Sequence, residues 1–152
     1  MKISRICLVA SAGGHLSQLL KLGNAWETYD VFYVSTLDSA GNKLRKLGRY
    51  YITGECNRNH PLRMLKVLTM SLKIIRSEKP NVIISTGAAP GLIMCLAGKL
   101  FGSKIIWVDS IANVEHLSLS GRIMRPFANL VLSQWPEVAG KYRKVEFVGT
   151  VV

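Results

Sequence analysis

A paired-glycine turn near the start of the chain separates an apolar segment from a helical pattern. The apolar segment, residues 3–9, has the length and composition of a buried strand. Residues 11–15 read Ser-Ala-Gly-Gly-His, and leucines then recur at helical spacing. Glycines let the chain turn sharply and let an anion approach the backbone, and a helix N-terminus favours negative charge. The unit therefore predicts a phosphate or diphosphate site at Ser11, Gly13, Gly14 and His15.

Strand-like and helix-like segments alternate along the rest of the chain. Strands are predicted at residues 31–35, 49–53, 81–85, 104–109, 130–133 and 145–148, and helices at 42–47, 61–77, 92–101 and 119–124. This alternation predicts an α/β fold: a Rossmann-like, doubly wound parallel sheet with helices on both faces. Ligands of such sheets bind at the carboxyl ends of the strands. Both glycine turns, at 11–15 and 86–91, follow predicted strands.

Size and composition limit the classes of protein that fit. The 152 residues predict one domain spanning 1–152, because the chain is too short for two. A formal net charge of +11 implies an anionic ligand or partner: phosphates, nucleic acid or an anionic membrane. Three scattered cysteines suggest neither a zinc site nor a disulfide framework, and favour a reducing cytoplasm. We expect no bound metal, no cofactor, no signal peptide and no membrane-spanning helix.

The first glycine turn has two interpretations. It lacks the third glycine of the dinucleotide fingerprint, and a tight strand–helix turn also occurs without a ligand. Its place after the first strand of a basic chain favours the phosphate site. His15 is either a phosphate ligand or general acid/base, or a helix-start residue bonded to the backbone. His60 and His116 have no partners at metal-ligand spacing.

Two later segments are candidates for the same cleft. Thr86 and Gly87 open a second glycine turn, which forms either a wall of the cleft or a close helix–sheet contact. Asp109, Ser110 and Asn113 follow a buried strand, where polar residues line a ligand cleft. Asp109 has the alternative of capping a turn. One of the two serines at positions 118 and 120 is a candidate helix N-cap rather than a ligand contact.

The predicted helix at 61–76 is apolar over more than half of its circumference. Lys66, Thr69, Lys73 and Arg76 form a narrow basic stripe on it. A helix lying on a sheet needs an apolar arc of about 100° or slightly more. The excess indicates a membrane or partner contact, or else a helix wedged between the sheet and a neighbouring helix. Basic residues here and at positions 122, 125, 141, 143 and 144 suit anionic lipid.

Five segments occur together in a distinctive order. They read Ala-Ser-Ala-Gly-Gly-His-Leu-Ser-Gln-Leu-Leu at 10–20, Ser-Thr-Gly at 85–87, Asp-Ser-Ile-Ala-Asn-Val at 109–114, Leu-Ser-Leu-Ser-Gly-Arg at 117–122 and Gln-Trp-Pro-Glu at 134–137. They resemble the accessory subunit of bipartite bacterial glycosyltransferases that build capsular and exopolysaccharides. The same family includes the membrane-anchor subunit of the eukaryotic transferase that adds the second N-acetylglucosamine to dolichol-linked oligosaccharide.

The chain is also similar to the N-terminal half of the N-acetylglucosaminyltransferase of peptidoglycan synthesis. This resemblance implies that Gly13, Gly14, His15, Thr86 and Gly87 contact a polyprenyl-diphosphate-linked sugar acceptor. The His-Glu-Gln-Asn segment of that enzyme has no match around residues 113–116. The catalytic roles of that loop are therefore not carried over.

The resemblance also implies partners. A GT-B glycosyltransferase needs two Rossmann-like domains, so a separate catalytic subunit is expected to bind the UDP-sugar donor. The linker to such a second domain would begin at residues 147–152. The eukaryotic anchor carries an N-terminal membrane helix, whereas this sequence has no apolar run long enough to span a bilayer. We therefore expect peripheral attachment to an anionic membrane at its cytoplasmic face. Alone, the chain is expected to be inactive or weakly active.

Two other functions fit parts of the pattern. A self-sufficient NAD- or UDP-sugar-dependent enzyme would need a third glycine and an acid after the second strand, where Asp38 lies nearby. A nucleic-acid-binding domain would explain the charge. No recognised motif interleaves the basic residues with aromatic ones, however, and we expect no nucleic-acid partner.

Overall fold

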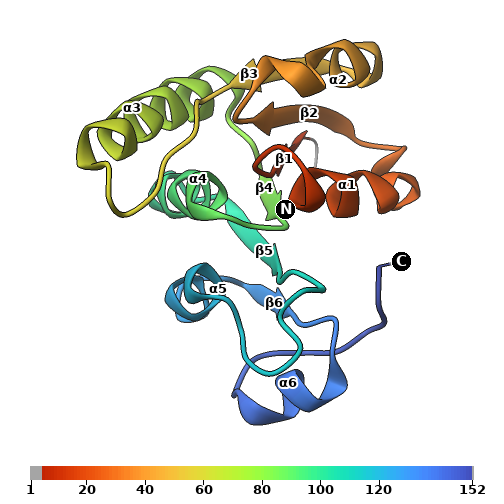
Figure 1. Cartoon of the computed structure of the whole chain (residues 1–152). Coiled ribbons are helices and arrows are strands. Elements are labelled where there is room, and N and C mark those ends of the chain that lie inside the picture. The colour runs from red at the N-terminus through yellow and green to blue at the C-terminus, as the bar shows by residue number, and fades with distance from the viewer. Residues whose placement is uncertain (1–4, 152) are drawn as a thin grey trace.

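The computed structural model describes residues 5–151, which form a parallel six-stranded sheet between two layers of helices (Figure 1). The strands are β1 (Arg5–Val9), β2 (Asp30–Ser35), β3 (Arg49–Ile52), β4 (Val82–Ser85), β5 (Lys104–Val108) and β6 (Leu130–Leu132). The sheet order is β3-β2-β1-β4-β5-β6, and every neighbouring pair is parallel. The predicted doubly wound Rossmann-like fold is confirmed. The connection reverses direction between β1 and β4, so the ligand crevice is expected there.

The helices follow the strands in the manner of βαβ units. They are α1 (Gly14–Lys21), α2 (Gly41–Leu47), α3 (Pro61–Glu78), α4 (Ala89–Leu100), α5 (Leu119–Met124) and α6 (Pro136–Lys141), with short 3-10 turns η1 (Gly23–Trp26) and η2 (Asp38–Ala40). Pro61 occupies the first turn of α3, where its missing N–H costs no hydrogen bond. Lys79 ends that helix in the left-handed conformation, with its N–H donating to the Ile75 carbonyl (2.8 Å).

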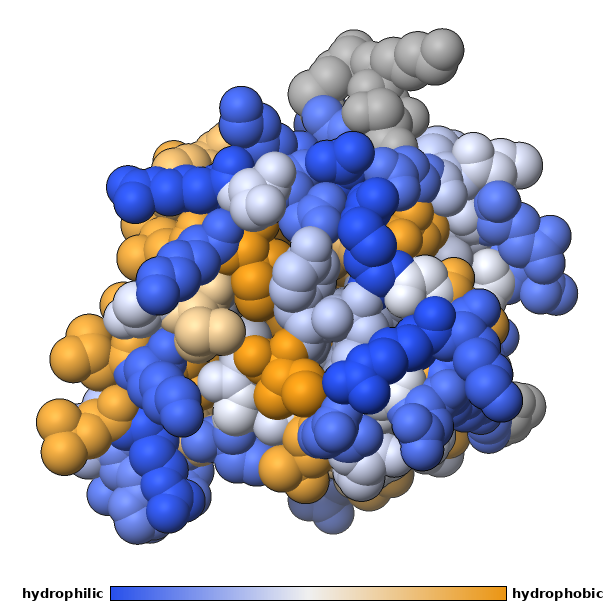
Figure 2. All heavy atoms as spheres, turned by 90° about the horizontal axis from the view of Figure 1, so that it is seen from above, coloured by the Kyte–Doolittle hydropathy of each residue, from blue (hydrophilic) through white to orange (hydrophobic). Residues whose placement is uncertain are grey.

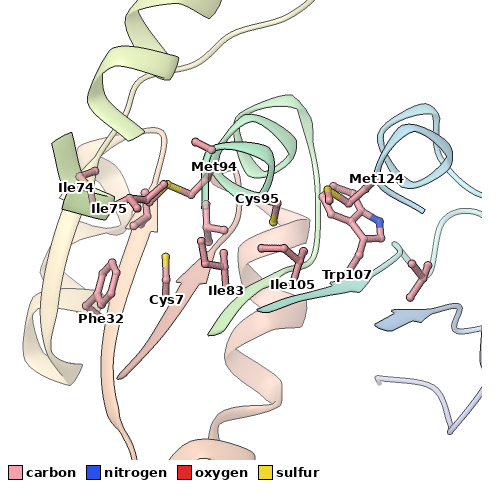
Figure 3. Close-up of a cluster of buried hydrophobic side chains, with 14 of the residues drawn as sticks. Cys7, Phe32, Ile74, Ile75, Ile83, Met94, Cys95, Ile105, Trp107 and Met124 are labelled. Atoms are coloured by element: carbon pink, nitrogen blue, oxygen red, sulfur yellow. The ribbon is translucent and has the colours of Figure 1, made fainter. Parts of the chain in front are cut away.

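Two apolar cores lie on opposite faces of the sheet. Figure 3 shows the larger one, where Phe32, Ile83 and Trp107 from the strands meet Ile75 of α3 and Met94 of α4. The second core packs α1 and α2 on the other face, around the fully buried side chains of strand and helix leucines: Leu8, Leu19 and Leu44. Because both faces are covered, the central strands read as continuous apolar runs rather than as alternating ones.

The predicted strand at 145–148 is wrong. The chain there makes an isolated parallel bridge between Leu132 and Glu146, held by two backbone hydrogen bonds of 2.9 Å. Val145 is buried, but Phe147 and Val148 are exposed and Gly149 turns away with a φ of 132°. The apolar residues of this run therefore do not extend a ladder.

Helix boundaries also differ from the predicted ones. The helix predicted from residue 92 begins at Ala89, because Pro90 and Gly91 lie within its first turn instead of in the preceding loop. The short helix α6 was not predicted, although Pro136 stands in its first turn. Residues 3 and 4 of the predicted first strand lie outside the described residues.

Candidate functional site

The two glycine turns meet at the carboxyl edge of the sheet. β1 and β4 are neighbours, with Val9 paired to Ser85, so the segments that follow them emerge side by side. The Ser11 N–H donates to the Gly87 carbonyl (3.3 Å), which joins the turns directly. The structure thus brings together two segments that lie 75 residues apart, counted from Ser11 to Thr86.

His15 is fixed between the turns by a pair of hydrogen bonds. Its ring Nδ1 lies 2.8 Å from the Thr86 carbonyl oxygen, and the Thr86 hydroxyl donates to the His15 carbonyl (2.6 Å). A carbonyl oxygen only accepts, so Nδ1 must carry the proton in this contact. In a neutral ring, Nε2 is then the unprotonated nitrogen and is available as a hydrogen-bond acceptor or base.

Gly87 makes room for this histidine. Its φ of 115° lies in a region that other residues rarely adopt, and a Cβ at this position would stand 2.8 Å from both Nδ1 and Cε1 of His15. The second turn, which follows β4, therefore packs directly against the His15 ring and leaves space for it.

The first turn leaves its backbone open to solvent. Gly13 has a φ of 99°, and a Cβ added at Gly13 or Gly14 would meet nothing within 4 Å. The Gly13 carbonyl accepts from Ser17, as the carbonyl before a helix normally does (3.0 Å). The first N–H groups of α1, by contrast, have no intrahelical acceptor because the carbonyls four residues before them lie outside the helix. Open backbone, free N–H groups and a helix N-terminus together suit an anion.

A cleft of about 250 Å³ lies beside His15 and unites the second turn with the segment after β5. It is lined by His15, Thr86, Gly87, Ala88, Asp109, Ser110, Ala112, Asn113, Ser118, Leu119 and Ser120. Six of the predicted site residues thus share one hollow. Ser11, Gly13 and Gly14 do not line it, and they stand on the side of His15 nearer β2.

Asp109 organises the loop after β5. Its side chain is 2% exposed and accepts from the Trp107 indole (3.0 Å), the Asn113 amide (3.1 Å), and the Ser118 N–H and hydroxyl (2.8 and 2.6 Å). The Ser118 hydroxyl also accepts from the Gly121 N–H, which makes it the N-cap of α5 (2.9 Å). The turn-capping interpretation of Asp109 therefore fits the structure better than direct ligand contact.

Two glutamines that the residue patterns alone did not single out hold the edge together. Gln134 is buried, and its amide nitrogen donates to Gln18 Oε1 (2.8 Å) and to the Asp109 carbonyl (3.0 Å). Gln18 in turn donates to the Ser110 hydroxyl (3.4 Å). Both glutamines lie in the distinctive segments of the sequence, but their pairing across 116 residues has no local signal.

An apolar groove of about 440 Å³ runs between the first half of α3 and the middle of α4. It is lined by Pro61, Met64, Leu65, Leu68, Ile93 and Leu96. Leu62 and Leu65 beside it are 82% and 59% exposed, so the excess apolar arc predicted for α3 is real. Figure 2 looks onto the side of α2 and α3 and shows apolar side chains among hydrophilic ones near its left edge, where α3 lies.

Residues 5–151 contain neither a cluster suited to a metal ion nor a membrane-spanning helix. These residues contain no group of three or more histidine, cysteine or acidic side chains placed to hold a metal ion. None of the helices formed by them has the length and apolar character needed to cross a bilayer.

Comparison with known proteins places the chain among oligosaccharide-synthesis proteins. The family described as "Oligosaccharide biosynthesis protein Alg14 like" matches residues 42–151. The UDP-N-acetylglucosamine transferase subunit alg14 of Schizosaccharomyces pombe is 31% identical over 92% of this chain and 80% of its own length. The human subunit of the same name is 26% identical over 97% of this chain and 82% of its own.

Solved structures show the same fold at lower identity. Acinetobacter baumannii MurG superposes with a TM-score of 0.77 at 17% identity, covering 97% of this chain and 45% of that one. The UDP-GlcNAc 2-epimerase of Methanocaldococcus jannaschii gives 0.73 at 13% identity, with 96% and 45% covered. The chain thus spans less than half of these proteins, and its match to the Yarrowia lipolytica ALG14 subunit, 38% identical over 55% of this chain, covers 41% of that subunit. The extent of the family match and the similarity to the fission-yeast subunit together show that the chain belongs to the Alg14 family.

Proposed function

We propose that the chain is the acceptor-side subunit of a two-chain, UDP-sugar-dependent glycosyltransferase. The observation that carries this proposal is the His15 ring, fixed by Thr86 between two glycine turns, beside open backbone at the start of α1. Membership of the Alg14 family supports it, because the relatives are named as subunits of UDP-N-acetylglucosamine transferases.

In this proposal the first turn holds the diphosphate of a polyprenyl-linked sugar. The free N–H groups at Gly14 and His15 donate to phosphate oxygens, and the α1 N-terminus adds a favourable field. Gly13 lets the ligand come close because no side chain stands there. The cleft lined by Thr86, Ser110 and Asn113 lies beside His15 and offers polar groups near the reacting hydroxyl.

His15 Nε2 is the proposed base for the transfer step. The acceptor hydroxyl attacks the anomeric carbon of the donor sugar, the bond from that carbon to the UDP oxygen breaks, and UDP leaves. The hydroxyl proton passes to Nε2, which is the nitrogen without a proton in the neutral ring whose Nδ1 donates to Thr86. Asp109 keeps the loop after β5 in place and does not touch the reacting atoms.

The donor UDP-sugar is proposed to bind on a separate catalytic subunit. The relatives support this part of the proposal, because they are named as subunits of UDP-N-acetylglucosamine transferases. A partner docked at the carboxyl edge would close the cleft over His15. We place this pair in bacterial capsular or exopolysaccharide synthesis, with no cofactor or metal bound to this chain.

The groove between α3 and α4 is the proposed membrane contact, on the cytoplasmic face. Helices that follow parallel strands begin at the carboxyl edge, so the start of α3, where Pro61 and Met64 line the groove, lies at the same end of the sheet as the glycine turns. Exposed leucines there provide apolar area, and neighbouring Arg63 and Lys66 attract anionic headgroups at about 1 kcal/mol each.

Gly14 offers a matched pair of variants for testing the diphosphate site. Gly14→Asp and Gly14→Asn add side chains of equal shape into open space, but only the first adds negative charge. With the partner subunit co-expressed, we expect Gly14→Asp to raise the KM for a lipid-linked acceptor more than tenfold and Gly14→Asn to raise it less. Equal effects of the two variants, or full activity of the partner without this chain, would contradict the proposal.

Vesicle binding tests the membrane contact separately. Replacing Leu62 and Leu65 by glutamine removes exposed apolar groups, and we expect binding to phosphatidylglycerol vesicles to fall at least fivefold with the melting temperature unchanged. Leu100→Gln is the control, since Leu100 is 84% exposed but lies at the opposite end of α4. If the control lost binding equally, the groove would not be the contact.

A further inference from the structure

An acidic side chain flanks the first glycine turn on the side away from the cleft. The Ala12 N–H donates to the Thr36 hydroxyl (3.0 Å), and Thr36 donates to Glu55 Oε1. Thr36 follows β2 and Glu55 follows β3, so both stand at the same edge as the turn. Because a hydroxyl has one proton and Ala12 is itself a donor, Thr36 must direct its proton to Glu55. The carboxylate therefore lies two hydrogen bonds from the backbone of the turn.

Glu55 keeps hydrogen-bonding capacity that other acids at this edge have used. Asp109 accepts four hydrogen bonds and is buried. Asp38 is paired with Arg45 at 2.8 Å. Glu55 is exposed, and among the described residues only Thr36 bonds its carboxylate, through one oxygen. Within residues 5–151, the other carboxylate oxygen has no hydrogen-bond donor.

The charge of Glu55 is unfavourable for the diphosphate alone. A carboxylate this close to a phosphate site repels the anion, but it accepts strong hydrogen bonds from hydroxyl groups. In sheets with this strand order, an acid near the end of the second strand binds the hydroxyls of a sugar whose phosphates lie on the first turn. Thr36 holds Glu55 at that position, although the acid itself follows the third strand.

We infer that Glu55 binds hydroxyl groups of the sugar attached to the diphosphate and thereby selects a sugar-bearing lipid over the bare lipid diphosphate. The inference rests on the proposed function, and it names Glu55 as a specificity residue of that site. The inference assigns Glu55 to the sugar bonded directly to the diphosphate, because the carboxylate lies two hydrogen bonds from the backbone of the turn proposed to hold the phosphates.

Glu55→Gln tests this inference because it keeps the shape and the oxygen that faces Thr36 but removes the charge. Binding of two probes to the full chain is measured: farnesyl diphosphate, and the same lipid diphosphate carrying N-acetylglucosamine. We expect the variant to bind the sugar-bearing probe at least fivefold more weakly and to bind farnesyl diphosphate as well as or better than wild type. Glu27→Gln, an exposed acid beside η1, is the control and should change neither affinity.

The possible results separate the two proposals. If wild type binds neither probe, the proposed function fails, and the inference fails with it. If wild type binds both probes and Glu55→Gln weakens both or neither, the Glu55 inference alone is overturned. A loss confined to UDP-N-acetylglucosamine binding would assign Glu55 to a nucleotide ribose and would also overturn it. Thr36→Ser should retain sugar selectivity and Thr36→Val should lose it, whereas a purely structural link would lower the melting temperature without changing selectivity.

Discussion

At the scale of single residues, one hydrogen bond decides which nitrogen of His15 faces a ligand. The Thr86 carbonyl accepts a hydrogen bond from Nδ1, so in the neutral ring Nε2 is the nitrogen that can accept. Three residues create this arrangement: His15 supplies the ring, Thr86 bonds both that ring and the His15 backbone carbonyl, and Gly87 leaves space for the ring. A histidine placed in this way suits proton transfer better than one that points freely into solvent.

Gly87→Ala tests whether the space at Gly87 determines the position of the His15 ring. The substitution forces a side chain onto a φ of 115° and places its Cβ 2.8 Å from the ring. We expect the free energy of unfolding in urea to fall by roughly 1–3 kcal/mol. The ¹⁵N signals of the His15 ring should also shift. Gly102→Ala is the control, because Gly102 has a φ of 86° and open space around it, so it carries the backbone strain without the clash. Unchanged His15 signals in Gly87→Ala would contradict this account.

The meeting of the two turns was predictable from the sequence, but the contacts of His15 were not. Parallel strands that follow one another through helices end at the same edge, so both turns had to emerge there. Which side chain crosses from one turn to the other depends on the separation and twist of β1 and β4. Asp109 illustrates the same limit, because its four donors come from residues on both sides of it that only the folded loop gathers.

At the scale of elements, tight packing between α4 and the sheet depends on small residues. A Cβ at Gly98 would lie 2.0 Å from Ile83 Cδ1, inside a fully buried cluster, so the helix approaches β4 closely only because this position is glycine. The sequence indicated the helix through its apolar residues. Its first turn was misplaced because Pro90 and Gly91 are typical of loops as well as of helix starts.

Gly98→Ala should therefore destabilise the protein, while Gly140→Ala should not. At Gly98 the added methyl group overpacks the core, and we expect a loss of roughly 1–3 kcal/mol in the free energy of unfolding. At Gly140, in α6, a Cβ meets nothing within 4 Å. Alanine there should add roughly 0.5–1 kcal/mol, since glycine is a poor helix former. Urea unfolding of both variants measures each change in the free energy of unfolding. A loss at Gly140 as large as that at Gly98 would refute the packing argument.

Ion pairs tie the beginnings of β1, β2 and β3 together. Asp30 accepts from Arg5 (2.7 Å) and Arg49 (2.8 Å). The hydrogen bond from Arg5, followed by the positive charges of Arg49 and Arg5, lowers the pKa of Asp30 in the folded protein. A carboxyl group with a lowered folded pKa stabilises the fold above its unfolded pKa of about 3.9, and this contribution disappears as the pH falls through the folded value.

Asp30→Asn should accordingly lower stability at neutral pH and have no charge-related effect in strong acid. Because Asp30 is 41% exposed, solvent screening keeps the expected loss below about 1 kcal/mol. Melting temperatures of wild type and variant measured from about pH 7 down to about pH 2 should begin to converge near pH 4 and approach each other as the pH falls through the lowered folded pKa of Asp30. A difference that is constant with pH would indicate a packing effect instead of the ion pair.

At the scale of the whole molecule, the chain carries a site that is open on one side. The glycine turns, His15 and the cleft occupy the carboxyl edge of one Rossmann-like sheet, and the apolar groove lies at the same end. A lipid with a diphosphate and a sugar would place its polar part at the turns and its tail toward the groove. The chain spans 45% of the solved proteins named above that share its fold.

The central claim is that the first glycine turn binds the diphosphate of a lipid-linked sugar. Its most direct test is a titration of the ¹⁵N-labelled full chain with a farnesyl-diphosphate-linked N-acetylglucosamine, followed by amide NMR. We predict saturable shifts of the Gly13, Gly14 and His15 amides that are abolished in Gly14→Asp. Unchanged signals at these three residues, or shifts produced by UDP-N-acetylglucosamine or NAD but not by the lipid, would contradict the claim.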